Sequence, residues 1–335
     1  MQIFSLQRVD AFHGLRQKVV QQLLDHAHES CSSGRAVDIG RAAFTIALNL
    51  LSNTVFSVDL AHYDSNLSQE FKELIWSILV EVGKPNLADF FPGLRLVDPQ
   101  GIHKRMSVYF NKLFDVFDSF INQRLQLRAS STDNDVLDAL LNLNKQHDHE
   151  LSCNDIRHLL VDLFSAGTDT TSSTIEWAMA ELLNNPKAMA KARDELSQVV
   201  APTRSIPTPR KAEMDSEILG YAVPKNAQVI INVWAIGRDS KTWSDPHSFG
   251  PERFLECDID VKGRDFQLIP FGAGRRICPG LLLGRRMVHL VLASLLHSFD
   301  WKLEGGMKPE DMDMSETFGF SVRKAQPLRV VPIKP

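Results

Sequence analysis

One helical pattern, running from Asn154 to the residue before Pro186, constrains the fold more than any other feature of the sequence. Asn154 is a suitable N-cap, and Pro186 is a stop signal. About 31 residues at 1.5 Å each give a helix of roughly 46 Å, long enough to cross a whole domain. We therefore expect a mainly α-helical fold that packs around one long central helix.

The sequence changes character near residue 200. Before it, apolar residues keep helical spacing, and the uncharged stretch Ala42 to Val58 indicates a buried helix. That stretch falls just short of bilayer length, so a membrane span is the weaker alternative. After it, residues 201–209 hold three prolines, which is typical of an extended connector.

The last third combines small β pieces with one more helix. Strand patterns cover 217–223 and 228–233, with a turn at Pro224 between them, and a final helix extends from Pro279 to about Ser298. We interpret residues 1–335 as a single, incomplete domain. Its predicted parts are a helical part (1–200), the proline-rich connector (201–209) and a loop-rich part (210–335).

Charge and cysteine content exclude several classes of protein. Lys and Arg number 37 against 41 Asp and Glu, a net charge of −4, so nucleic acid is not an expected partner. The four cysteines form no CxxC pair and are too few for a disulfide framework, which argues against a zinc knuckle and favours a reducing compartment. The first eight residues do not read as a signal peptide.

The glycine-rich segment Phe271 to Gly280 ends in a cysteine at the start of the final helix. With Pro279 as first helical residue, the sulfur of Cys278 would face free backbone N–H groups and the positive end of the helix dipole. Arg275 and Arg276 would also favour a thiolate, which is a good soft ligand for iron. The alternative is a small buried cysteine after a tight turn.

A second unusual segment, 166–174, lies inside the long helix and is rich in small hydroxyl residues. Such residues are poor helix formers and can loosen or bend a helix. Apolar residues on both sides indicate burial, so the acid and hydroxyls need partners or a task. A solvent-facing polar patch or a tight helix crossing is the alternative.

The pattern Phe-x-x-Gly-x-Arg-x-Cys-x-Gly resembles the haem-binding loop of the cytochromes P-450, the haem-thiolate monooxygenases. The resemblance implies that Cys278 is the proximal iron ligand of haem b (iron protoporphyrin IX). It further implies that Arg276 reaches a haem propionate and that Phe271 packs beside the thiolate. Gly274 and Gly280 would give the turn room.

The hydroxyl-rich segment resembles the oxygen-binding helix pattern of the same family. By that resemblance Gly167 opens the groove above the iron, Thr170 bonds the bound oxygen or its water, and Asp169 helps to relay protons. Arg210 would meet the other propionate, or else be a solvated loop charge. Residues 318–320 resemble the family's last substrate-contact turn, or else form an ordinary hairpin tip.

The resemblance implies a monooxygenase that inserts one oxygen atom of O₂ into a C–H bond of an apolar small molecule. Electrons would come from NADPH through a reductase. It would dock on a basic face formed by four arginines, unless these are only solvated charges: Arg275, Arg276, Arg285 and Arg286. The sequence of residues 234–239 is similar to that of plant terpenoid hydroxylases of the geraniol 8-hydroxylase and ferruginol synthase group. The family location is the cytosolic face of the endoplasmic reticulum membrane, and membrane association is expected only through the family.

Two departures from the family pattern open an alternative. The family's first third, with its membrane anchor, is not in this sequence, and no Glu-x-x-Arg motif precedes Arg210. Without that motif, we expect Arg253 to be an unpaired, partly buried charge, which is costly. The alternative is therefore a truncated, non-catalytic fragment that does not retain haem.

Two further enzyme classes stay open. A haem-thiolate isomerase or dehydratase would need no reductase, but the Asp169-Thr170 pair argues against it. A cysteine nucleophile with a histidine base is conceivable among eleven histidines, none of which lies in a recognisable nucleophile motif.

Overall fold

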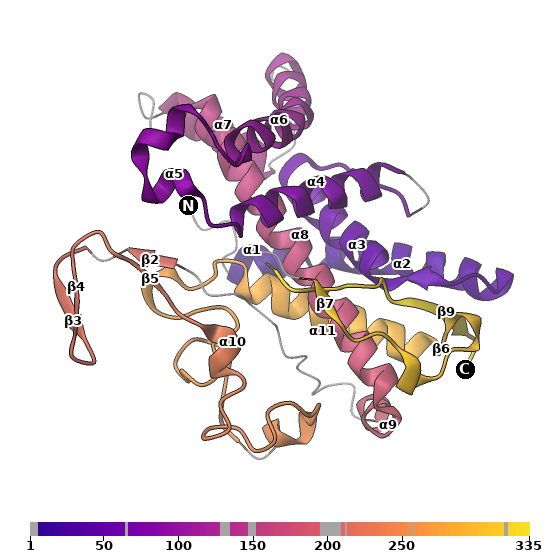
Figure 1. Ribbon diagram of the computed structural model, residues 1–335. Coiled ribbons are helices and arrows are strands. Elements are labelled where there is room, and N and C mark those ends of the chain that lie inside the picture. The colour runs from indigo at the N-terminus through magenta and orange to yellow at the C-terminus, as the bar shows by residue number, and fades with distance from the viewer. Residues whose placement is uncertain are drawn as a thin grey trace.

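The computed structural model describes residues 6–63, 66–127, 135–146, 152–194, 209–211, 213–255, 257–317 and 321–335. The fold is mainly helical, as predicted, with small strands at its edges (Figure 1). The helices are α1 (Leu6–Ala11), α2 (His13–Ser33), α3 (Ile39–Phe56), α4 (Asn66–Val82), α5 (Leu87–Phe90), α6 (Ile102–Leu127), α7 (Val136–Gln146), α8 (Cys153–Asn184), α9 (Pro186–Asp194), α10 (Val233–Ile236) and α11 (Leu281–Ser298). The 3₁₀ turns are η1 (Pro92–Leu96), η2 (Pro251–Phe254), η3 (Gly274–Arg276), η4 (Glu304–Gly306) and η5 (Pro309–Asp311).

The long central helix is confirmed as α8, which has 32 residues and passes through the middle of the molecule (Figure 1). Its N-cap is Ser152 and not the predicted Asn154, because Ser152 and Asp155 form a reciprocal capping box. The hydroxyl-rich segment does not interrupt the helix. Thr168 and Thr174 instead donate to the carbonyls of the preceding turn, so their hydroxyls are satisfied within the helix.

The uncharged stretch forms α3, and 16 of its 18 residues are buried. Its polar residues find partners inside the protein: the Asn49 amide donates to the Ala61 carbonyl at 2.7 Å and accepts from the Ala61 N–H at 2.9 Å. This confirms the buried-helix interpretation. No helix within the described residues is long and apolar enough to cross a membrane.

Two apolar cores meet along α3 and α8. One core joins α2, the second half of α8, α11 and the C-terminal strands, and it includes Phe299 and Trp301. The other joins α4, α6, α7 and the first half of α8, and it includes Phe117 and Phe164. Because α3 and α8 contribute to both, they form the rigid axis on which the other elements are placed.

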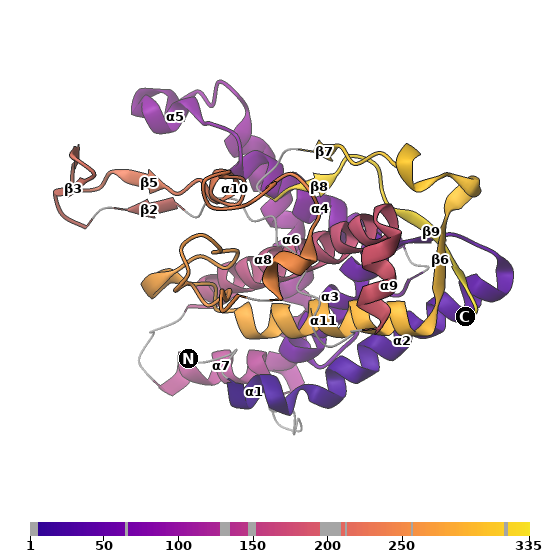
Figure 2. The same cartoon turned by 90° about the horizontal axis from the view of Figure 1, so that it is seen from below.

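The strands are β1 (Val37–Asp38), β2 (Pro209–Lys211), β3 (Ser216–Ile218), β4 (Tyr221–Val223), β5 (Gln228–Ile230), β6 (Asp300–Leu303), β7 (Glu316–Thr317), β8 (Arg323–Lys324) and β9 (Arg329–Ile333). β9 lies between β1 and β6 in an antiparallel sheet, and β2–β5, β3–β4 and β7–β8 are antiparallel pairs. Figure 2 shows the β2–β5 and β3–β4 pairs extending away from the helices.

Three further boundary predictions are wrong. The strand expected over 228–233 ends at Ile230, and α10 begins at Val233. The single strand expected over 217–223 is a hairpin, because Leu219 and Gly220 adopt positive φ values of 52° and 83° and reverse the chain. The final helix begins at Leu281 with Gly280 as its N-cap, so Pro279 precedes the helix. Of the proline-rich connector, residues 201–208 lie outside the described residues, and its last residue begins β2.

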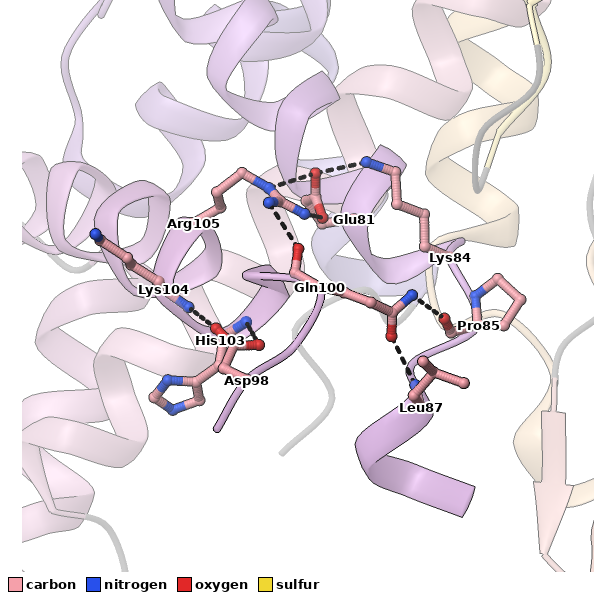
Figure 3. A network of polar contacts seen from close by, with 9 residues as sticks. All are labelled: Glu81, Lys84, Pro85, Leu87, Asp98, Gln100, His103, Lys104 and Arg105. Atoms are coloured by element: carbon pink, nitrogen blue, oxygen red, sulfur yellow. Dashed lines mark hydrogen bonds and ion pairs between the residues drawn. The ribbon is translucent and has the colours of Figure 1, made fainter. Parts of the chain in front are cut away.

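A polar network stabilises the segment 83–101, which connects α4 to α6 (Figure 3). Arg105 of α6 makes a two-point ion pair with the buried carboxylate of Glu81 on α4, at 2.8 and 3.0 Å. The Gln100 side chain bridges the Pro85 carbonyl and the Leu87 N–H. These contacts fix both ends of the segment that contains α5 and η1, at the end of α4 and at the start of α6.

Candidate functional site

The cysteine loop is a closed turn ahead of α11. The Cys278 N–H donates to the Phe271 carbonyl at 2.9 Å, and the Ile277 N–H donates to the Gly274 carbonyl at 3.1 Å. Gly272 and Gly274 adopt φ values of 72° and 67°, in the left-handed region that favours glycine. These contacts set the position of Cys278 before any ligand binds.

The thiol of Cys278 is open to solvent on one side. The surrounding protein raises its pKa, and the backbone N–H groups of Gly280 and Leu281 bond to it and act in the opposite direction. These two N–H groups belong to the N-cap and the first residue of α11, and the role of Cys278 as a ligand stays a prediction. The expectation that the protein alone favours a thiolate is wrong, because burial raises the pKa of the thiol more than the two N–H groups lower it. A coordinating metal ion deprotonates such a thiol outright.

The loop that contains Gly263 packs against the backbone of the cysteine loop. Gly263 has φ of 77°, and a Cβ there would stand 2.7 Å from the Gly272 carbonyl oxygen and 2.9 Å from Ala273 Cα. The ring of Phe271 lies against Gly284 of α11, where a Cβ would meet it at 3.8 Å. The turn is thus packed between residue 263 and the first turns of α11.

The donor set suits an iron porphyrin. Cys278 is exposed, and a Cβ at the neighbouring Gly274 would meet no atom within 4 Å, so the thiol side of the turn is open. An exposed cysteine of this kind can give one thiolate ligand to an iron porphyrin. No cluster of three or more His, Cys, Asp or Glu able to hold a bare metal ion occurs among the described residues.

The arginines expected to serve this face are partly neutralised. Arg276 and Arg285 are exposed, whereas Arg275 pairs with Glu213 at 3.5 Å and Arg286 pairs with Asp10. The predicted basic face is therefore weaker than the four charges alone suggest. Arg210 lies in β2 opposite Val229, and its side chain is outside the described part of the chain.

Arg253 makes no ion pair with a carboxylate among the described residues, as expected, but the expectation that its partly buried donors lack partners is wrong. Its guanidinium donates to the backbone carbonyls of Ser244, Asp245, Ser248 and Gly250, at 2.9 to 3.0 Å. The loop before η2 curls around this side chain and supplies neutral acceptors in place of a carboxylate. The local sequence thus provides hydrogen-bond acceptors for the guanidinium without the missing motif.

The hydroxyl-rich part of α8 presents different residues to different sides. Thr170 is exposed and donates to the Ala166 carbonyl, which leaves its oxygen lone pairs free to accept a hydrogen bond. Asp169 is fully buried and binds Arg323 and Ser321. A Cβ at Gly167 would meet Leu51 of α3 at 2.8 Å, so this glycine permits the close crossing of α3 and α8. Its predicted role beside the iron stays a prediction.

Sequence reasoning missed the partners of Asp169 and the support from Gly263. Ser321 and Arg323 lie about 150 positions further along the chain, so no local pattern connects them with α8. For Gly263 a signal existed: it lies in a Lys-Gly-Arg turn in a loop-rich stretch. Residues 318–320, the predicted substrate-contact turn, lie outside the described residues.

Comparison with known proteins agrees with this site. The profile of the family described as "Cytochrome P450" matches residues 1–208 and 202–329. The chain is 50% identical to "Cytochrome P450 76T24" of Catharanthus roseus, with 99% of this chain and 72% of the relative covered. It is 50% identical to "Geraniol 8-hydroxylase" of the same plant (98% and 73% covered) and 47% identical to "Drimenol monooxygenase" of Persicaria hydropiper (99% and 72% covered).

The matches also locate the irregular part of the sequence. The two profile segments meet at residues 202–208, where the Glu-x-x-Arg helix was expected. The alignment with the first relative extends over 362 residues, more than the 335 of this chain, so that relative contains aligned residues without a counterpart here. With the family matched along nearly the whole chain and the cysteine loop in place, this chain belongs to the cytochrome P-450 family of haem-thiolate monooxygenases.

Proposed function

We propose that this protein hydroxylates an apolar small molecule of the terpenoid class, using O₂ and electrons from NADPH. The observation that carries the proposal is the exposed Cys278, fixed by the bond from its N–H to the Phe271 carbonyl in the closed turn ahead of α11. The relatives named as geraniol 8-hydroxylase and drimenol monooxygenase support the terpenoid class. Haem, when bound, supplies the oxygen activation that no amino-acid side chain provides.

In this proposal the residues of the chain hold the cofactor and move protons. Cys278 binds the iron as a thiolate, and the Gly280 and Leu281 N–H groups stabilise its negative charge. Arg276 and Arg210 bind the propionates. Thr170 accepts or passes a proton through its exposed hydroxyl, and Asp169 supplies the charged end of that relay.

We further propose that a reductase docks near Arg276 and Arg285, two exposed arginines of the basic face for which no ion pair is found among the described residues. Rim charges of this kind raise association rates at low salt. The endoplasmic reticulum membrane is the proposed location, by analogy with the family.

The iron-ligand assignment predicts the result of Cys278→Ser. The reduced CO complex of the parent should show the long-wavelength Soret band of a thiolate-bound haem, and the serine variant should lose it because an alcohol is a poor soft ligand. Cys257→Ser, at a half-buried cysteine outside the loop, should keep the band. Circular dichroism checks that both variants fold. Survival of the band in Cys278→Ser contradicts the assignment.

Haem content separates the enzyme from the alternative of a fragment without haem. The protein is supplied with hemin, purified, and analysed for haem per chain. One haem per chain supports the enzyme. A folded, colourless protein supports the fragment.

The relay assignment predicts that Thr170→Ala releases more peroxide per NADPH consumed, because proton delivery is lost while electron supply continues. Thr174→Ala is the matched control, since its hydroxyl makes the same contact one turn later but is buried. Peroxide and product are measured together. Unchanged coupling in Thr170→Ala removes this residue from the relay.

A further inference from the structure

The carboxylate of Asp169 is fully buried on α8, and both of its oxygens have partners. Oδ1 accepts from the guanidinium of Arg323, and Oδ2 accepts from the hydroxyl of Ser321. A buried carboxylate without such donors would be costly in its charged form. The two donors come from the C-terminal segment, and they account for a charged acid inside the protein.

Arg323 is itself held on two sides. Its side chain is 14% exposed, it pairs with Asp169, and its guanidinium lies 4.2 Å from the centre of the Trp76 ring on α4. Burial lowers its pKa to about 10, so it is still a cation at neutral pH. Lys72 of α4 is close enough to be affected by the charge of Arg323, and burial is the main cause that lowers the pKa of that lysine.

The contacts continue along one face of α8. Ser173 and Trp177 both donate to the Val322 carbonyl, at 2.7 and 3.2 Å, and Glu176 accepts from the Leu328 N–H at 2.9 Å. Positions 169, 173, 176 and 177 follow the spacing of one helical face. The segment 321–328 therefore lies along α8 and is fixed at several points.

We propose that Arg323 is a positioning residue for Asp169: it keeps the carboxylate charged and fixed in place directly before Thr170 on α8. Ser321 completes the hold by donating to the second oxygen. The inference rests on the proposed function only where it concerns proton delivery, because the contacts themselves involve no cofactor.

The first test uses the full chain without haem and reads the protonation of Asp169 by infrared spectroscopy. Arg323→Met removes the positive charge, so the buried carboxyl should take up a proton and show the C=O stretching band of a carboxylic acid at neutral pH. Arg323→Lys keeps the charge and should show no such band. In the double variant Asp169→Asn with Arg323→Met the band should be absent, which assigns it to Asp169.

Lys324→Met is the matched control, because Lys324 lies in the same segment but contacts the Asp313 carbonyl and the Trp177 ring. The charge of Lys324 also lowers the pKa of the buried Glu176, so the band compared in both variants is the part that Asp169→Asn removes. Lys324→Met should show no such band. No acid band in a folded Arg323→Met variant overturns the proposal, and so does an equal band in Lys324→Met. If Arg323→Met does not fold, Arg323→Lys is used instead. Thermal stability shows that this variant folds, and an acid band in its infrared spectrum overturns the proposal.

The second test uses the haem-loaded protein. Arg323→Met should lower product formed per NADPH on the order of tenfold, below the full 10²–10⁴-fold contribution of a positioned acid or base. Arg323→Lys should recover most of the coupling. Unchanged coupling in the methionine variant counts against the role in proton delivery. A protein that binds no haem contradicts the proposed function alone, since the infrared result still decides the position of Arg323.

Discussion

Single residues around the cysteine loop show why the site is in place before any ligand binds. Gly263 leaves no space for a side chain because the backbone of residues 272 and 273 stands where a Cβ would be. The loop behind the site and the loop that carries the thiol are thus in backbone contact. Any atom added at residue 263 must displace one of the two loops.

Substitution of Gly263 by alanine should lower the free energy of unfolding by about 2–4 kcal/mol, from backbone strain and overpacking together. Gly305→Ala is the matched control, because Gly305 has φ of 68° but open space around it, and strain alone should cost about 1–2 kcal/mol. Urea unfolding followed by circular dichroism measures both. Equal losses in the two variants would mean that the close approach at Gly263 contributes nothing.

At the scale of elements, the Glu81–Arg105 ion pair joins the end of α4 to the start of α6 (Figure 3). The Arg105 guanidinium lowers the pKa of the Glu81 carboxyl below its ordinary value of 4.5, with a smaller contribution from Lys84. The stabilisation from this depressed pKa is complete above the unfolded-state value. It is lost as the pH falls through the lower, folded-state pKa.

Glu81→Gln should therefore lower the free energy of unfolding by about 1–2 kcal/mol at pH 7, the contribution of a charged hydrogen bond with exposed partners. The difference from the parent protein should shrink as the pH falls below 4.5, because the parent then loses the same charge. Urea titrations at several pH values measure it. Glu73→Gln, in an exposed pair with Gln69, should change stability by less than about 0.5 kcal/mol. A Glu81→Gln difference that stays constant down to acid pH would contradict the ion-pair explanation.

The elements also show what the sequence could and could not predict. The long helix, the buried uncharged helix and the cysteine loop were predicted, because helical spacing and glycine turns are local signals. The hairpin at Leu219-Gly220 was missed because a positive φ at leucine is uncommon. The pairing of Asp169 with Arg323 joins α8 to the last strands, and no local pattern contains it.

For the whole molecule, the two cores that meet on α3 and α8 explain how a chain with an irregular junction at 202–208 keeps a packed interior. The core that includes Phe117 draws its residues only from helices before that junction, whereas the core that includes Trp301 joins helices before it to α11 and the strands after it. The β2–β5 and β3–β4 pairs that follow the junction extend away from the helices (Figure 2). The packing that supports Cys278 and α8 is thus largely independent of the junction.

The loop around Arg253 has a consequence for how this family tolerates changes in length. Four carbonyls between residues 244 and 250 bind the guanidinium from within a stretch of ten residues. Because all of these acceptors lie after β5, the loop does not need residues ahead of β2 to hold Arg253, and a change in length there should leave its conformation unchanged.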